Sequence, residues 1–357
     1  MNKEEQRPDY SIEISGVWKI FGEKAQQALA DIQANGLSKK EVHEKYDCVV
    51  GVADVTLQIK RGEIFCVMGL SGSGKSTLVR HINRLLEPTA GQILIDGQDI
   101  MKADQDELMK RRNEDIAMVF QNFALMPHRS VLDNVAMPLE IRNVPKNKRM
   151  EIANEILGLV ELSGWGNKFA HELSGGMQQR VGLARALAAD PKILLMDEPF
   201  SALDPLIRRQ LQDEFMKLAE TMNKTTVFIT HDLDEAVRIG DRIAIMRDGR
   251  VVQIGTPEEI VMEPADDYVA DFVAGISRLK VVKAHAVMQP INEFEEANGK
   301  LGKDAREFGE DDNLSVLITA AIEDDKAIAI TDDNGSRIGA ITRADLLKTV
   351  IEGTETS

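Results

Sequence analysis

The 357-residue sequence has only two cysteines, no apolar segment at its start and no excess of positive charge. Cys48 and Cys66 are widely spaced and no metal-binding pattern flanks them, which indicates reduced structural thiols of a cytosolic protein. Cys66 lies in an apolar run and is expected in the core. The first residues lack an apolar stretch, so we expect no signal peptide. No segment approaches the length of a membrane span, so any membrane role should come through a partner.

The charge balance also limits the class of protein. The 59 acidic residues outnumber the 43 basic ones, which gives a formal net charge of −16. A nucleic-acid-binding protein would usually show a basic face, so we expect no nucleic-acid partner. Hydrophobic residues make up 43% of the chain, enough for one large domain and a smaller one.

Strand-like and helix-like segments alternate along most of the chain. The expected strands are residues 11–22, 52–59, 63–68, 92–95, 116–120, 193–197, 226–230 and 242–247. The expected helices are residues 24–46 in two pieces, 78–86, 148–160, 178–189, 205–222 and 233–238. A capping box of Ser38 and Glu41 opens the second piece of 24–46. The alternation predicts an α/β sheet with a mainly helical insertion over about 104–185.

The composition changes near residue 275, where the chain becomes rich in Asp and Glu. We therefore predict one domain over 1–276 and a second, small one over 277–357. In the second domain we expect a helix at 314–322, strands at 327–331 and 338–342, a turn at 332–335 and a helix at 344–351. The polar run 295–313 is expected to be a loop.

A phosphate-binding loop stands out at residues 69–77, which read Gly-Leu-Ser-Gly-Ser-Gly-Lys-Ser-Thr between an expected strand and an expected helix. Its glycines let backbone N–H groups surround phosphates, Lys75 supplies a positive charge, and the Ser76 hydroxyl is placed to bind Mg²⁺. The residues expected to hold the nucleotide here are Gly69, Ser71, Gly72, Ser73, Gly74, Lys75, Ser76 and Thr77.

Acidic and polar residues follow three other expected strands. Strand 193–197 delivers Asp197, expected to hold Mg²⁺ directly or through water, and Glu198, expected to polarise the attacking water as general base. The alternative for Glu198 is a cap of the next loop. His231 leaves strand 226–230 at the edge where ligands gather, and is expected to contact the γ-phosphate. Gln121 follows strand 116–120, where a surface glutamine is an equal alternative to a Mg²⁺ or water contact.

A second Gly-rich turn lies just upstream of the acidic strand. Residues 173–180 read Leu-Ser-Gly-Gly-Met-Gln-Gln-Arg, so Ser174, Gly175 and Gly176 present N–H groups and a hydroxyl at a helix start. Such a surface binds anions. The simplest use of two phosphate-binding turns in one chain is a nucleotide sandwiched between two copies of the protein.

These elements, in this order, resemble the ATP-binding subunit of ABC transporters over about residues 10–276. The matching elements are the loop 69–77, Gln121, residues 173–180, residues 194–199, Ser-Ala-Leu-Asp at 201–204 and His231. The resemblance implies a P-loop NTPase (RecA-like) core with an antiparallel β edge and a helical insertion, acting as an ATPase. Met177 departs from the family pattern, because many members have Gln there.

The resemblance also implies roles for individual residues. Gln121 would be the Q-loop residue, Asp204 the D-loop residue and His231 the switch histidine, with ATP and Mg²⁺ as cofactors. Ser174 and Gly176 would contact the γ-phosphate of ATP bound to the other subunit. The implied Mg²⁺ ligands are Ser76, Gln121 and Asp197. An aromatic residue near position 20 would stack on adenine, with Phe21 in the usual position and Trp18 as the alternative.

A finer resemblance points to the branch of this family that imports glycine betaine, proline betaine and choline. It depends on the extension at 24–50 and on the amino-acid sequence of residues 120–128 and 200–208. It implies a homodimer on the cytoplasmic face of the inner membrane. Its partners would be a permease, contacted near residues 123–128, and indirectly an extracytoplasmic substrate-binding protein.

The end of the chain resembles a single CBS module, a small α+β fold. Residues 279–288 resemble its first strand, and residues 314–351 the remaining elements. Two roles stay open at this point, regulation by a nucleotide or by ionic strength, and pairing with the copy in the other subunit.

Other functions fit the sequence less well. An importer of another small solute, such as an amino acid, would use the same ATPase residues. Soluble ABC proteins of DNA repair carry coiled coils or zinc cysteines, and those of translation carry two ATPase domains; this chain has neither feature. A non-catalytic scaffold would not need Glu198 and His231, and a GTPase would carry an Asn-Lys-x-Asp motif.

Overall fold

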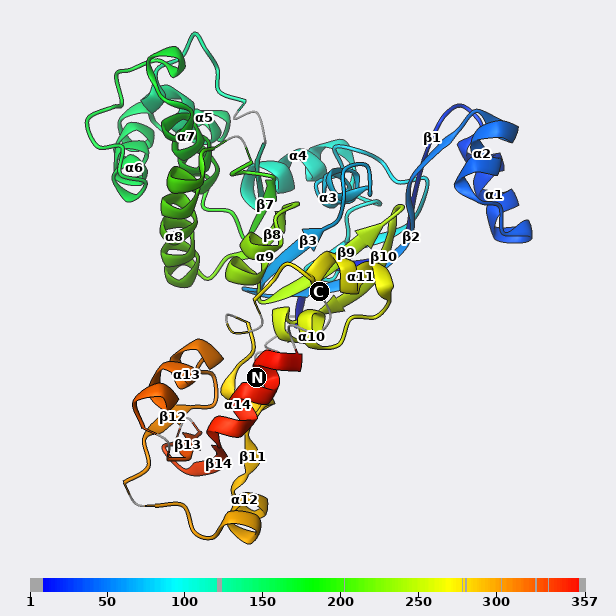
Figure 1. Ribbon diagram of the computed structural model, residues 1–357. Helices are drawn as coiled ribbons and strands as arrows, with labels where there is room; N and C mark the ends of the chain where they lie inside the picture. Colours follow the sequence, from blue (N-terminus) through cyan, green and yellow to red (C-terminus); the bar gives the residue numbers. More distant parts are fainter. Residues whose placement is uncertain are drawn as a thin grey trace, which may run out of the picture. The chain divides into compact units, whose positions relative to one another are not determined.

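The computed structural model in Figure 1 describes residues 9–120, 124–201, 203–277, 279, 281–302, 304–324, 326–332 and 334–352. The chain divides into two compact units, Met1–Ile254 and Gly255–Ser357. Helices α10 (Pro257–Met262) and α11 (Asp267–Val273) belong to the second unit. The domain boundary expected after residue 276 stays a prediction.

The centre of the first unit is a mainly parallel sheet (Figure 1). Its strands, among the described residues and in spatial order, are β10 (Arg250–Gly255), β9 (Arg242–Arg247), β3 (Ile64–Met68), β8 (Thr225–Ile229), β7 (Ile193–Asp197) and β6 (Ile116–Val119). Strands β9, β3, β8, β7 and β6 run parallel. Their carboxyl ends therefore meet at one edge, where ligands bind in open α/β sheets.

An antiparallel sheet forms the second layer of this unit. Its order is β2 (Val49–Lys60), β1 (Tyr10–Phe21), β4 (Ala90–Ile95) and the short β5 (Gln98–Asp99). A continuous apolar core lies between the two sheets and includes Ile12, Ile59 and Phe65, all fully buried. The α/β core with an antiparallel edge is thus confirmed.

The predicted extension between β1 and β2 is a pair of helices, α1 (Ala25–Asn35) and α2 (Lys39–Tyr46). The capping box is present: the Glu41 N–H donates to the Ser38 side chain, and the Glu41 carboxylate accepts from the Ser38 N–H. The two helices bury a separate apolar cluster that includes Trp18 of β1.

The predicted helical insertion contains α4 (Gln105–Glu114) and the mutually packed α5 (Val131–Ile141), α6 (Lys146–Leu159) and α7 (Gly175–Ala188). Two further helices follow the insertion, α8 (Pro205–Met222) and α9 (Leu233–Ile239). The remaining helix, α3, covers Lys75–Ile82 and not residues 78–86 as predicted. It begins at the phosphate loop itself, and it ends early because Arg84 has a left-handed backbone, with φ of 53°.

The second unit is an α+β fold around its own apolar core. Its sheet has the order β11 (Gln289–Pro290), β14 (Arg337–Ile341), β13 (Ile328–Thr331) and β12 (Glu307–Gly309). Its helices include α12 (Ile291–Asn298), α13 (Leu314–Glu323) and α14 (Arg343–Glu352). The predicted helices and strands after residue 313 are confirmed, and Asp333 of the predicted turn lies outside the described residues.

Two predictions for this unit were wrong. The expected strand at 279–288 contains a short 3₁₀ helix at Ala284–Ala286, because the N–H groups of Ala284 and His285 donate to the carbonyls of Asp312 and Glu310 instead of to a sheet partner. The expected loop 295–313 holds the end of α12 and all of β12. The CBS-like role of the unit stays a prediction.

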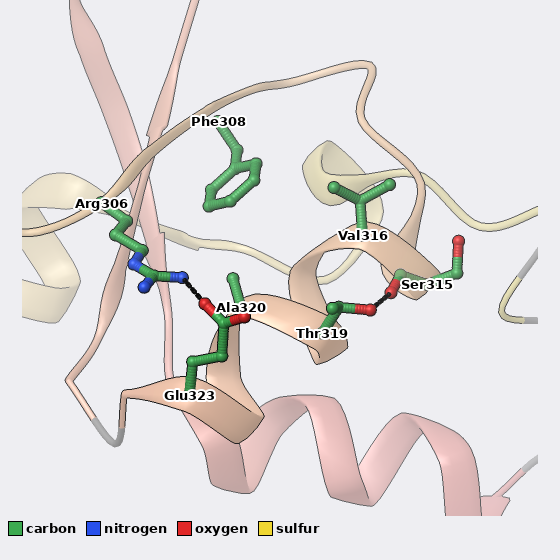
Figure 2. A pocket seen from close by; sticks show the side chains of 7 residues that line it. All are labelled: Arg306, Phe308, Ser315, Val316, Thr319, Ala320 and Glu323. Carbon is green, nitrogen blue, oxygen red and sulfur yellow. Dashed lines mark hydrogen bonds and ion pairs between the residues drawn. The ribbon is translucent and has the colours of Figure 1, made fainter.

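Beside α13 the second unit has an open cavity of about 530 Å³. It is lined by Arg306, Phe308, Ser315, Val316, Thr319, Ala320 and Glu323. Figure 2 shows Arg306 and Glu323 pointing toward each other on one side of the cavity, and an ion pair of 2.7 Å joins them.

Candidate functional site

The phosphate loop follows β3 and runs into α3, as predicted. Its glycines are required by the backbone: a Cβ on Gly69 would come within 2.2 Å of the Met246 carbonyl oxygen, and one on Gly74 within 2.3 Å of the Gly51 carbonyl oxygen. Gly69 and Gly74 also have positive φ values, which side chains disfavour. The loop is therefore wedged between β2 and the end of β9, and its open side faces the carboxyl edge of the sheet.

Lys75 is folded back into this loop. Its Nζ donates to the carbonyl oxygens of Gly69, at 2.8 Å, and Leu70, at 3.1 Å, and the residue is 5% exposed. Burial lowers the pKa of Lys75, while the nearby carboxylates of Glu198 and Asp197 raise it. A buried ammonium group whose hydrogen bonds go to carbonyl oxygens is a strong attractor for phosphate oxygens.

Asp197 ends β7 and faces α3. Its Oδ1 accepts from the Ser76 hydroxyl at 2.7 Å, and its Oδ2 pairs with the Arg80 guanidinium at 3.2 Å. Arg80 was not among the residues predicted for the site. The signal was available, because Arg80 lies four residues after Ser76 and hence on the same face of a helix.

Glu198 and His231 are brought together at the same edge. The His231 Nδ1 lies 3.1 Å from the Glu198 Oε2. The backbone of Glu198 is left-handed, with φ of 47°. Two hydrogen bonds hold it: the Glu198 N–H donates to the Ile229 carbonyl, and the Ser201 hydroxyl donates to the Glu198 carbonyl. The carboxylate is thus aimed across the sheet edge toward β8 and the histidine.

Gln121 lies outside the described residues, together with its two successors. The chain on both sides is described: β6 ends at Val119, and Ala124 accepts a hydrogen bond of 2.6 Å from the buried Arg185 of α7. The expected role of Gln121 stays a prediction.

The second Gly-rich turn caps α7. The Ser174 side chain accepts from the Met177 N–H at 3.3 Å, and Ser174 and Gly175 are exposed. A Cβ on Gly175 would meet no atom within 4 Å, whereas one on Gly176 would lie 2.8 Å from the Ile207 Cγ2. The turn is therefore open to a large ligand on one side and packed on α8 on the other.

Asp204 caps α8, and its Oδ1 accepts from the N–H groups of Leu206 and Ile207, both at 3.1 Å. Its side chain is exposed at the beginning of the helix. The D-loop role implied by the resemblance stays a prediction.

The two candidates for the adenine-stacking residue differ in their surroundings. Trp18 is 7% exposed and packs under α1 and α2, whereas Phe21 is 40% exposed. The Phe21 ring lies against Gly51, where an added Cβ would approach it to 2.7 Å, and the Lys19 Nζ is 5.1 Å from its centroid. Phe21 is therefore the more accessible of the two rings, and its stacking role stays a prediction.

A phosphate loop, an Asp-Glu pair and a histidine at the carboxyl edge of a mainly parallel sheet define a P-loop ATPase. The turn at 174–176 and the helical insertion are the further elements in which the chain resembles the ATP-binding subunits of ABC transporters. Residues 52–201 match the family described as ABC transporter, and the chain belongs to the ATP-binding proteins of that family, which makes it an ATPase.

Two curated relatives extend over almost the whole chain. The glycine betaine/proline betaine transport system ATP-binding protein ProV of Escherichia coli is 49% identical over 340 residues, covering 95% of this chain and 82% of that protein. The trimethylamine N-oxide transport system ATP-binding protein TmoW of Pelagibacter ubique is 43% identical over 342 residues, covering 96% and 98%.

One solved structure with a similar fold is a dimer. It is a dimeric, post-hydrolysis ATP-binding cassette bound to ADP and Pi, 34% identical, with a TM-score of 0.58, covering 69% of this chain and 98% of that one. No described helix of the present chain has both the length and the apolar character that crossing a bilayer requires.

Proposed function

We propose that this chain is the ATP-hydrolysing subunit of an ABC importer for glycine betaine, proline betaine or choline. The observation that carries the proposal is the 49% identity to a glycine betaine/proline betaine transport protein over 95% of the chain, well beyond the cassette motifs alone. Trimethylamine N-oxide is a second candidate solute, because the chain covers 98% of the length of a relative that is named for the transport of this compound. All these solutes carry a nitrogen that bears a formal positive charge.

In the proposed site, ATP binds along the edge of the parallel sheet. The amides of the phosphate loop and the Lys75 ammonium hold the β- and γ-phosphates, and Phe21 stacks on the adenine. Lys75 would exchange its hydrogen bonds to the carbonyls of Gly69 and Leu70 for bonds to phosphate oxygens. ATP could therefore bind without a large movement of the Lys75 side chain.

The oxygens at the end of β7 fit a Mg²⁺ ion. The Ser76 hydroxyl and the Asp197 Oδ1 converge to 2.7 Å, a few tenths of an ångström less than the roughly 3.0 Å that separates neighbouring ligands of an octahedral ion at about 2.1 Å. Both are hard oxygen donors, and phosphate oxygens, with Gln121, would complete the set. The ion would neutralise charge that develops on the γ-phosphate.

Hydrolysis would then depend on Glu198 and His231. Glu198 orients and polarises a water molecule in line with the γ-phosphate, and His231 fixes the carboxylate through the 3.1 Å contact and reaches the γ-phosphate oxygens.

The unit that hydrolyses ATP is proposed to be a homodimer. The exposed turn at 174–176 is open on the side away from α8, as a surface that receives a phosphate from another molecule would be. The similar cassette that binds ADP and Pi as a dimer supports this arrangement. Asp204, at the beginning of α8, would reach across the same interface.

The permease is proposed to contact the insertion beside the Gln121 loop. Met126 and Phe169 are exposed apolar side chains there. An isolated β-bridge between Ser130 and Phe169 joins the segment before α5 to the segment before α7. We propose that the chain acts at the cytoplasmic face of the inner membrane, with the substrate-binding protein acting on the other side and no nucleic-acid partner.

Uptake by the reconstituted importer tests the solute. We expect labelled glycine betaine to be accumulated, choline and proline betaine to compete, and an unrelated amino acid to have no effect. A complex containing Glu198→Gln is the control and should accumulate nothing. Stronger competition by trimethylamine N-oxide than by any betaine would move the assignment to that solute, and uptake of the amino acid alone would refute the proposal.

Phe21→Ala tests the adenine platform. Loss of a stacked ring should weaken ATP binding roughly tenfold, while the affinity for inorganic tripolyphosphate, which lacks a base, stays unchanged. Phe21→Tyr should bind ATP normally. Trp18→Ala is the matched aromatic control, and it should lower the unfolding midpoint because it opens a cavity under α1 and α2. Equal weakening of both ligands by Phe21→Ala would contradict the stacking role.

A further inference from the structure

The two helices whose first turns are proposed to reach the other subunit lie directly against each other. Ser174 caps α7 and Asp204 caps α8. At the first level of contact, Gly176 packs so closely on Ile207 that a Cβ would come to 2.8 Å. The turn at 174–176 and the beginning of α8 are thus in van der Waals contact, and the two helices contact each other.

A second level of contact lies one turn further along α7. The Arg180 Nη2 donates to the Glu214 Oε1 at 2.8 Å, and the side chains of Arg180 and Glu214 are only 15% and 21% exposed. Arg180 follows Gly176 by four residues and Glu214 follows Ile207 by seven, so each pair shares one helix face. Packing at one level and an ion pair at the next fix both the distance and the rotation of the two helices.

Arg180 also reaches a third helix. Its Nη1 donates to the Glu161 Oε2 at 3.1 Å and to the Val160 carbonyl at 3.4 Å, both just past the end of α6. The Glu161 carboxylate is 68% exposed, so this contact is screened by water and contributes little. The less exposed partner of Arg180 is Glu214, whose pKa is raised by burial and by the neighbouring Glu161 carboxylate, and is only partly lowered by the arginine.

We propose that Arg180 and Glu214 are positioning residues that hold the turn at 174–176 and Asp204 at a fixed spacing, so that both engage the ATP of the other subunit in one step. The inference rests on the proposed homodimer. It assigns the pair no contact with nucleotide. Its loss should therefore leave ATP binding to a single subunit intact and weaken ATP-driven dimer formation.

A double-mutant cycle in the full chain tests this. The parent carries Glu198→Gln, so that ATP is bound and not consumed, and the variants are Arg180→Gln, Glu214→Gln and both together. Glu161→Gln is the comparison variant, because it removes the exposed carboxylate beside Arg180 and Glu214 and leaves the ion pair between those two residues in place. Two quantities are measured: the affinity of dilute, monomeric protein for a fluorescent ATP analogue, and the ATP concentration that gives half-maximal dimer in sedimentation.

Each single variant should raise that ATP concentration roughly tenfold, since it leaves a half-buried charge without its partner. The double variant should recover to within about threefold of the parent. Single-subunit affinity should change less than about twofold in all variants, and Glu161→Gln should match the parent.

Four results would overturn the proposal. They are additive losses in the double variant, an equal loss of single-subunit affinity, no loss in the single variants, or easier dimerisation, which would show that the pair holds an open state. A parent that stays monomeric in ATP would refute the shared site itself, and this inference with it. Denaturant unfolding of each variant separates a loss of folding from a loss of positioning.

Discussion

Replacing Glu198 by Gln should leave ATP binding intact, trap the protein as an ATP-bound dimer, and lower the rate of hydrolysis by at least about 100-fold. The amide keeps the size of the side chain and can still hydrogen-bond His231, which lies 3.1 Å from the Glu198 Oε2. It cannot accept a proton from the attacking water. The γ-phosphate, which joins the two subunits in the proposed dimer, would then not be removed.

Phosphate release and sedimentation in Mg-ATP measure the two parts of this expectation. Glu87→Gln is the matched control, because Glu87 follows the phosphate-loop helix, pairs with Arg84 on the surface and has no role in the proposed site. It should hydrolyse ATP like the unaltered protein. Normal turnover by Glu198→Gln would remove Glu198 as the base, and a monomeric Glu198→Gln protein in ATP would argue against the dimer.

Sequence correctly predicted the place in the fold of the segments that are encoded by short spacings. The phosphate loop needs a fixed order of Gly, Lys and Ser within nine residues, and Asp197 and Glu198 need only an apolar strand before them. The end of α3 was placed wrongly because it depends on the left-handed backbone of Arg84, which no local preference of arginine indicates.

The choice between Trp18 and Phe21 shows what sequence could not decide. Both are aromatic residues near the end of one strand, and the register of β1 is irregular at Val17 and Lys19, so simple alternation does not assign their faces. Trp18 is buried because α1 and α2 pack over it. That packing brings together residues from distant parts of the chain, and only the folded chain shows that Phe21 is the more exposed of the two rings.

Long-range pairs were invisible for the same reason. Arg180 and Glu214 lie 34 residues apart on different helices, and each alone is an ordinary charge in a helix. The wrongly predicted strand at 279–288 shows the opposite error, in which a local pattern suggested an element that does not form. Backbone N–H groups of this segment donate to the carbonyls of Glu310 and Asp312, which lie farther along the second unit. Local pattern gives the element type when neighbours agree with it, and tertiary contacts decide the rest.

Ser174→Arg should abolish hydrolysis, by at least about 100-fold, while single-subunit ATP affinity changes less than about twofold. The hydroxyl now caps α7 at 3.3 Å from the Met177 N–H, and the residue is exposed at the open side of the turn. An arginine there fills the space that the γ-phosphate of the other subunit would occupy. Loss of the cap alone costs about 1 kcal/mol, which is too little to stop catalysis in a folded protein.

Ser130→Arg separates these two effects. Ser130 caps α5 of the same insertion in the same way, accepting from the Asp133 N–H at 3.0 Å, and lies outside the proposed nucleotide site. It should lower the free energy of unfolding about as much as Ser174→Arg does and retain hydrolysis. Equal loss of hydrolysis in both variants would show that helix capping, and not the nucleotide contact, explains the effect.

A mixing experiment then tests whether the site is shared. Ser174→Arg has an intact phosphate loop and a blocked turn, and Lys75→Ala has a weakened loop and an intact turn. Each should be inactive alone. In a mixed dimer, the loop of the first faces the turn of the second, so one complete site forms and hydrolysis should return to a substantial fraction of normal. A mixture as inactive as its components would argue that both turns belong to the site of one subunit. Only a site built from two chains can be completed by combining two variants with different defects.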